Sequence, residues 1–190
     1  MVSAIFRIGA FFAGVCFSLH PLCGDLTSEP FVEPSSSCVF EKDKSYSAII
    51  HTSKGKLVCA LYPEKAPITV TNFLQLVEGE FYNGLTFHRV IANFVIQSGS
   101  SNNRGDGDPG YTLPAEIGLK HELGSLACPR IPDECNPNRR SNGSQFYITL
   151  DKIPFLDGED TVFGQVVEGF EIIKNIVESD KIDRIEIEVK

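Results

Sequence analysis

Short runs in which apolar and polar residues alternate recur along the chain from residue 46 onward, separated by turn residues. In the clearest run, Ile185, Ile187 and Val189 alternate with charged residues. A period of two is typical of a strand that buries one face. The pattern predicts eight strands, at residues 46–51, 56–62, 86–91, 94–98, 125–128, 145–150, 161–166 and 182–189.

Two further segments have helical spacing instead. Their apolar residues recur three or four positions apart: Val70, Phe73, Leu74 and Val77 in the first, and Phe170, Ile173 and Val177 in the second. The first segment follows Pro67, a residue suited to the first turn of a helix, and precedes Gly79. Because eight short strands in an open sheet would leave exposed edges, we expect the sheet to close as a barrel.

Residues 1–24 differ from the rest of the chain. A single cation, Arg7, precedes an uncharged apolar stretch at residues 8–19, which is too short to span a bilayer as a helix. We therefore interpret residues 1–24 as a signal peptide that is cleaved after Gly24 or near Ser18, and we expect no stable membrane span. The protein would then be exported, to a periplasm or as a secreted protein. An uncleaved anchor and a lipid-modified Cys23 are the alternatives.

The following segment, residues 25–45, is rich in Ser, Pro and Glu and has little apolar periodicity. This composition is typical of a flexible tether. The remaining stretch, residues 46–190, is long enough for one domain with its own core.

Composition excludes some classes of partner. The chain carries 17 basic and 25 acidic residues, a formal net charge of −8. An acidic protein without a basic run is poorly suited to bind nucleic acid, so we expect no nucleic-acid partner. We also expect a monomer.

The cysteines fit an oxidising compartment. Two of the six lie in the predicted signal peptide, and the other four are Cys38, Cys59, Cys128 and Cys135. Four thiols can pair in three ways, and no C-x-x-C motif points to zinc or to a thioredoxin-like site.

Among these pairings we predict a local disulfide between Cys128 and Cys135. The two cysteines are seven positions apart, Pro129 and Pro132 stiffen the interval, and export would supply an oxidant. Cys38 is then the candidate for a free or intermolecular thiol.

The segment FHRVIANFVIQ, residues 87–97, places one arginine within an apolar run. A hairpin centred on Asn93 would set Arg89 opposite Gln97, whose carbonyl oxygen could orient the guanidinium. Phe94 and Val95 would flank the guanidinium and keep it nearly dry, which strengthens any hydrogen bond that it makes. The residues alone equally allow a structural arginine that pairs with a carboxylate.

This segment extends to FHRVIANFVIQSG, which resembles the signature of the cyclophilins, the peptidyl-prolyl cis-trans isomerases. Four further stretches agree in order and spacing: residues 66–90 (APITVTNFLQLVEGEFYNGLTFHRV), 110–116 (GYTLPAE), 142–150 (NGSQFYITL) and 156–169 (LDGEDTVFGQVVEG). The resemblance covers about residues 46–189. The compact loops of the chain resemble those of the short bacterial members of the family.

The resemblance implies a mainly β fold, a closed eight-stranded antiparallel barrel capped by two α-helices. It implies that the catalytic residues are Arg89, Phe94 and Gln97. It places the substrate-binding residues at Val95, Gln145, Tyr147, Phe155, Leu156 and Arg130.

Three features depart from the family pattern. Phe155 stands where many members have tryptophan, and Asp160 stands where many have histidine. The loop at residues 128–140 is longer than its counterpart. We expect the first two changes to alter the rim of the pocket and its ligand preference more than turnover.

The implied chemistry is rotation about the X–Pro bond, which resonance slows by a barrier of roughly 18–20 kcal/mol. The twisted transition state gains a lone pair on the prolyl nitrogen, to which Arg89 could donate. No metal and no cofactor are needed. The expected partners are proline-containing unfolded or flexible polypeptides in exported or folding proteins. The alternative is a binding or chaperone module of the same fold with little turnover.

Overall fold

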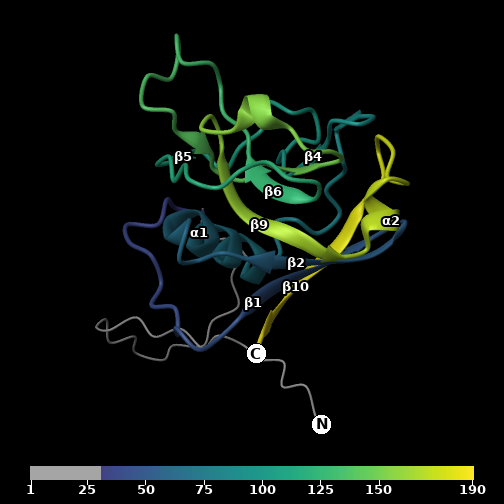
Figure 1. Cartoon of the computed structure of the whole chain (residues 1–190), viewed down its shortest axis with the longest axis horizontal. Helices are drawn as coiled ribbons and strands as arrows, with labels where there is room; N and C mark the ends of the chain where they lie inside the picture. The colour runs from purple at the N-terminus through teal and green to yellow at the C-terminus, as the bar shows by residue number, and fades with distance from the viewer. Residues whose placement is uncertain (1–30) are drawn as a thin grey trace, which may run out of the picture.

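A computed structural model of the chain describes residues 31–190 and consists mainly of antiparallel β structure (Figure 1). The strands are β1 Tyr46–Thr52, β2 Gly55–Leu61, β3 Arg89–Ile91, β4 Val95–Ser98, β5 Thr112–Leu113, β6 Ser125–Cys128, β7 Ser141–Asn142, β8 Phe146–Thr149, β9 Thr161–Glu168 and β10 Ile182–Val189. The helices are α1 Pro67–Glu78, α2 Phe170–Ile173 and a 3₁₀ turn at Pro154–Leu156. The predicted signal peptide, with Cys16 and Cys23, lies outside the described residues.

Eight strands form one sheet in the order β10-β1-β2-β9-β6-β8-β4-β3, and each neighbouring pair is antiparallel. They correspond to the eight strands that alternation predicts. Within residues 31–190 the first and last strands, β10 and β3, do not pair with each other. The prediction of a closed barrel is therefore wrong, and the sheet is a curled half-barrel.

The gap between the two edges has a physical cause in the segment before β3. The sequence predicts a strand at residues 86–91. In the structure residues 86–88 are irregular, and β3 has only the three residues Arg89–Ile91. Single backbone bonds replace a ladder there, such as Gly84 N–H to the Ile182 carbonyl at 2.8 Å and Phe87 N–H to the Asp180 carbonyl at 2.9 Å. Together with an isolated antiparallel bridge between Thr86 and Lys181, these bonds connect the two edges, but no continuous ladder forms between β10 and β3.

Two very short strands, β5 and β7, form a separate pair that alternation does not predict. Each has two residues, which is too few for a period of two to be visible in the sequence. The second helix is also shorter than its apolar spacing suggests. It ends at Ile173, and Val177 is exposed.

The main core lies between α1 and the curled sheet. Phe73 on α1 packs against the rings of Tyr82, Phe146 and Phe163, with centroid distances of 5.3, 6.0 and 5.4 Å. A second, smaller cluster lies on the β4–β8–β6–β9 part of the sheet, and its buried members are Val95, Ala127, Tyr147, Ile153 and Val162. This second cluster contains two of the predicted pocket residues.

The described part of the predicted tether, residues 31–45, contains no helix or strand and contacts the domain. The Phe31 and Phe81 rings meet edge to face at 5.3 Å, and Glu33 forms a 2.6 Å ion pair with Arg140. The Cys38 N–H donates to the Thr71 hydroxyl at 2.8 Å. These contacts place residues 31–45 on the domain surface.

The predicted disulfide is not formed, since Cys128 and Cys135 are both free thiols. Cys128 ends β6 with its side chain buried, and burial raises the pKa of its thiol above the ordinary range. Cys135 is exposed on the loop that follows. The two side chains therefore occupy different environments, one inside the fold and one on its surface.

Candidate functional site

The β3–β4 hairpin brings Arg89 and Gln97 together as the sequence predicts. The two residues are partners in the strand register, and Asn93 in the turn has a positive φ of 59°. Arg89 Nη1 donates to Gln97 Oε1 at 3.0 Å. The predicted orienting contact is therefore present.

Gln97 is itself held from behind by a second glutamine. Its Nε2 donates to Gln145 Oε1 at 2.8 Å, and Gln145 Nε2 donates to the carbonyls of Gly105 and Gly107 at 3.0 and 2.9 Å. In this series of hydrogen bonds, Arg89 donates to Gln97 and Gln97 donates to Gln145. Gln145 in turn donates to the two backbone carbonyls. The relay fixes Gln97 with its oxygen toward Arg89.

The guanidinium is less dry than the sequence suggests. Arg89 is exposed, because β3 is an edge strand with only one ladder partner. Its guanidinium lies 5.6 Å from the centre of the Phe94 ring, and Phe94 stacks on Phe155 at 5.8 Å. The expectation of a nearly dry arginine in the free protein is therefore wrong, and a ligand over Phe94 would have to cover it.

The predicted pocket residues lie beside this arginine. Val95 and Tyr147 are buried in the second cluster, and Phe94 and Leu156 are partly buried against it. Phe155 is 71% exposed and stands at the rim. An exposed cation thus borders a small apolar surface with an aromatic edge.

A polar network behind this surface fixes the Tyr147 ring. The Tyr147 hydroxyl donates to Asp160 Oδ2 at 2.8 Å and lies 2.9 Å from Nε2 of the fully buried His121. His121 Nδ1 in turn lies 3.3 Å from Asp157 Oδ1. Sequence reasoning missed His121, because its partners are 26 and 36 residues away and no motif joins them.

Arg130, predicted to bind substrate, belongs to the same network. Its side chain is 8% exposed and donates to the Glu159 carbonyl at 2.8 Å and the Glu159 carboxylate at 2.6 Å. It also pairs with Asp133 and approaches Asp160 at 3.4 Å. The long loop turns this guanidinium inward, where it holds the 157–160 turn, and the role of Arg130 in binding substrate stays a prediction.

Burial sets the ionisation of Asp160. Removal from water raises the pKa of its carboxyl above the ordinary value, although the Tyr147 hydrogen bond and the Arg130 charge oppose this shift. The folded state thus binds the Asp160 proton more tightly than the unfolded chain does. The contribution of this protonation to the stability of the folded state is complete below the ordinary pKa of aspartate. It is lost as the pH rises through the raised pKa of Asp160.

We expect Asp160→Asn to remove this loss, because asparagine accepts the same Tyr147 hydrogen bond without a charge. The free energy of unfolding of the variant, minus that of the unchanged protein, should increase as the pH rises above about 4, the ordinary pKa of an aspartate. Urea denaturation across that range measures it. A difference that stays constant with pH would show that Asp160 does not titrate as described.

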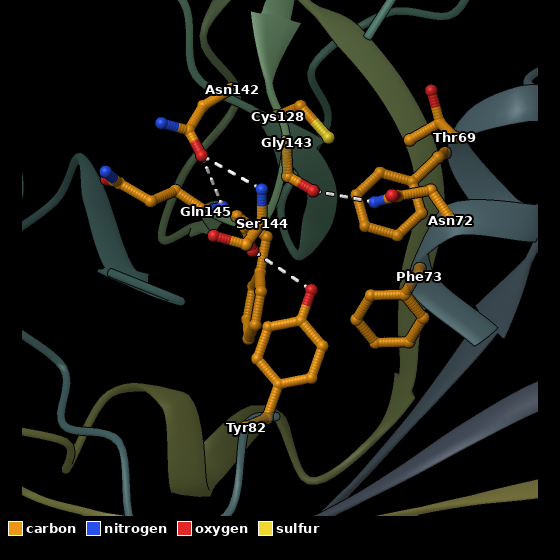
Figure 2. A pocket seen from close by; sticks show the side chains of 11 residues that line it. Thr69, Asn72, Phe73, Tyr82, Cys128, Asn142, Gly143, Ser144 and Gln145 are labelled. Carbon is orange, nitrogen blue, oxygen red and sulfur yellow. Dashed lines mark hydrogen bonds between the residues drawn. The ribbon is translucent and has the colours of Figure 1, made fainter. Parts of the chain in front are cut away.

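Gln145 owes its position to buried polar contacts around a cavity of about 10 Å³ (Figure 2). Asn142 Oδ1 accepts the N–H groups of Ser144 and Gln145 at 2.9 and 2.8 Å. The Tyr82 hydroxyl donates to the Ser144 carbonyl at 3.0 Å, and Asn72 Nδ2 donates to the Gly143 carbonyl at 2.7 Å. Residues 142–145 are therefore tied to α1 and to the segment after it.

Two further searches cover the described part of the chain. Between residues 31 and 190 there is no group of three or more His, Cys, Asp or Glu side chains that could hold a metal ion. The same residues include no helix of the length and apolarity needed to cross a membrane.

Comparison with known proteins gives consistent matches. A family model described as cyclophilin type peptidyl-prolyl cis-trans isomerase/CLD matches residues 47–190. A peptidyl-prolyl cis-trans isomerase of Helicobacter pylori is 38% identical over 150 residues, covering 76% of this chain and 88% of the relative. Peptidyl-prolyl cis-trans isomerase B of Bacillus subtilis is 41% identical over 136 residues, covering 70% and 91%.

Solved structures agree with the sequence matches. A cyclophilin type peptidyl-prolyl cis-trans isomerase of Cryptosporidium parvum superposes with a TM-score of 0.69 at 31% identity, covering 75% of this chain and 97% of that one. A second structure of that protein, in the presence of the dipeptide Ala-Pro, superposes with a TM-score of 0.68 at 30% identity, covering 74% and 98%.

Proposed function

The chain belongs to the cyclophilin-type peptidyl-prolyl cis-trans isomerase family, and from that premise we propose that Arg89 supplies the decisive interaction of its isomerase reaction. The enzyme rotates the X–Pro peptide bond of proline-containing, unfolded or flexible polypeptides. In the twisted state the prolyl nitrogen carries a lone pair, and the Arg89 guanidinium donates a hydrogen bond to it. No bond is broken and no proton is transferred.

The energetic role of this bond follows from its timing. In the planar peptide the nitrogen lone pair is delocalised by resonance and cannot accept a hydrogen bond. The hydrogen bond from Arg89 to this nitrogen therefore exists only in the twisted state. An interaction made only in the transition state raises turnover without tightening substrate binding. By comparison with other pre-oriented donors, one such bond is worth about 3 kcal/mol.

The relay behind Arg89 carries this proposal. Gln97 accepts from Nη1 at 3.0 Å, which leaves the other guanidinium N–H groups for a ligand. The neighbouring apolar surface of Phe94, Val95 and Tyr147 suits a proline ring. A peptide seated there would exclude water from Arg89 and strengthen its hydrogen bonds. For the family member from Cryptosporidium parvum, a structure in the presence of Ala-Pro is known.

The pH dependence of turnover tests the absence of proton transfer. An arginine stays charged throughout the ordinary range, whereas burial and the Arg89 charge lower the pKa of His88, and burial raises that of Asp160. With kcat measured on a proline tetrapeptide, we expect a flat profile from about pH 7 to pH 9, because the lowered pKa keeps His88 neutral there and the reaction transfers no proton. A bell-shaped profile in that range would contradict the mechanism, because it would indicate an essential acid and base.

The cellular location of the substrates forms a separate part of the proposal. The apolar stretch at residues 8–19 and the small residues near Gly24 support export, so the clients would be exported proteins. Mass spectrometry of the intact chain recovered from its native host tests whether the first residues are cleaved. A mature protein that lacks about the first 24 residues would support export, and a full-length soluble protein would contradict it.

A further inference from the structure

The loop that follows β4 contains a serine whose side chain is fully enclosed. Ser100 has no exposed surface, although it lies in a polar loop of glycine, asparagine and aspartate. Its hydroxyl oxygen accepts the N–H groups of Gly105 and Gly107 at 3.0 and 3.1 Å. Its own proton goes to Asn102 Oδ1 at 2.8 Å. One hydroxyl thus holds three points of the loop.

These bonds determine where two backbone carbonyls point. The backbone turns sharply at Gly105, which has a left-handed φ of 93°. At Gly107 neighbouring atoms leave no space for a side chain. A Cβ at Gly107 would lie 2.6 Å from the Ser101 hydroxyl. In this conformation both carbonyls face Gln145 Nε2 and accept its two protons.

The two carbonyls decide the orientation of the glutamine relay. An amide group has donors at one end and an acceptor at the other, so two carbonyl acceptors fix Gln145 with its oxygen toward Gln97. Gln97 must then present its NH₂ group to Gln145 and its oxygen to Arg89. If Gln145 turned over, Gln97 would follow, and its NH₂ group would face a guanidinium that has only donors.

We propose that Ser100 is a positioning residue for the isomerase reaction, acting through Gly105, Gly107, Gln145 and Gln97 on Arg89. Its hydroxyl holds the loop in the form that keeps both glutamine amides correctly oriented. The inference rests on the proposed role of Arg89 as the transition-state donor. It adds that the alignment of Arg89 is controlled from a loop that contributes no side chain to the apolar surface.

The test uses Ser100→Ala in the full chain, with Ser101→Ala as the matched control. Ser101 is the exposed neighbour in the same loop, and its hydroxyl donates to the Asp108 carbonyl at 3.1 Å. We expect Ser100→Ala to lower kcat by roughly tenfold with KM within about twofold, the pattern of a contribution made in the transition state. Ser101→Ala should keep the kcat and KM of the unchanged protein.

The second readout repeats Ser100→Ala in the presence of Arg89→Ala. If Ser100 acts through Arg89, its substitution should change the residual kcat by less than about twofold in that background. A tenfold loss in both backgrounds, or no loss in either, would overturn the inference while leaving the role of Arg89 intact. If Arg89→Ala alone leaves turnover unchanged, the proposed function fails instead.

A third variant covers the case in which Ser100→Ala does not fold. Ser100→Cys keeps a side chain in the enclosed space but replaces the oxygen by a weak acceptor. We expect the same direction of change, with a kcat loss that again disappears when Arg89 is alanine. The side-chain NH₂ signals of Gln97 and Gln145 in NMR spectra should shift in this variant. Unmoved signals together with normal turnover would contradict the proposal.

Discussion

Arg89→Ala is expected to lower kcat by on the order of a hundredfold or more, because it removes a donor worth about 3 kcal/mol in the transition state. Stability should change little, since Arg89 is exposed on an edge strand and its side-chain partners are Gln97 and the Phe94 ring. Typical surface substitutions change the free energy of unfolding by less than about 0.5 kcal/mol. The measurements are turnover of a proline peptide and the urea midpoint.

A matched control comes from a second exposed strand arginine. Arg184 on β10 donates to Glu186 at 2.7 Å, and Arg184→Ala should leave turnover and stability unchanged. Of the salt bridges among residues 31–190, none includes Arg89, which removes the main support for a structural ion-pair role. A stable Arg89→Ala protein with near-normal turnover would refute the catalytic assignment.

Gly99→Ala is expected to damage fold and site together. Gly99 has a φ of 85°, and an added Cβ would overlap the Ser144 carbonyl oxygen and lie 2.9 Å from Gln145 Cα. The neighbours are backbone atoms and cannot move aside cheaply. We expect a loss of about 3 kcal/mol in the free energy of unfolding, from left-handed backbone and overpacking together. Because Gln145 must shift, kcat of the folded fraction should also fall.

Gly110→Ala separates these two causes. Gly110 has a similar φ of 94°, but a Cβ there would meet nothing within 4 Å. This control should lose about 1 kcal/mol from the backbone conformation alone and keep normal turnover. Equal losses of stability and of kcat in the two variants would contradict the contact between Gly99 and the 144–145 backbone as the cause.

The strand pattern and the central pair of the site were both accessible from the sequence. Alternation is a local signal, and it located all eight strands of the main sheet. The hairpin also placed Arg89 opposite Gln97, because register follows from the position of the turn. Barrel closure depends on a long-range pairing of edges, and the irregular segment before β3 prevents it. Local periodicity contains no information on that pairing.

The support around the site was hidden for a similar reason. The His121–Tyr147–Asp160 contacts join residues far apart in sequence, and the inward turn of Arg130 depends on a loop without periodicity. The failed Cys128–Cys135 disulfide shows the limit of spacing arguments. A spacing of seven residues permits a bridge, but in the fold one thiol is buried on β6, the other is exposed on the following loop, and both are free.

The most direct test of Arg89 as a transition-state donor is NMR exchange on a peptide with one X–Pro bond, recorded with the enzyme and with its Arg89→Ala variant. This experiment gives the affinity for the peptide and the rate of cis-trans exchange while the peptide is bound. We predict affinities within about twofold and an exchange rate on the variant that is lower by on the order of a hundredfold. A variant that binds far more weakly but exchanges its bound peptide at the normal rate would contradict the account.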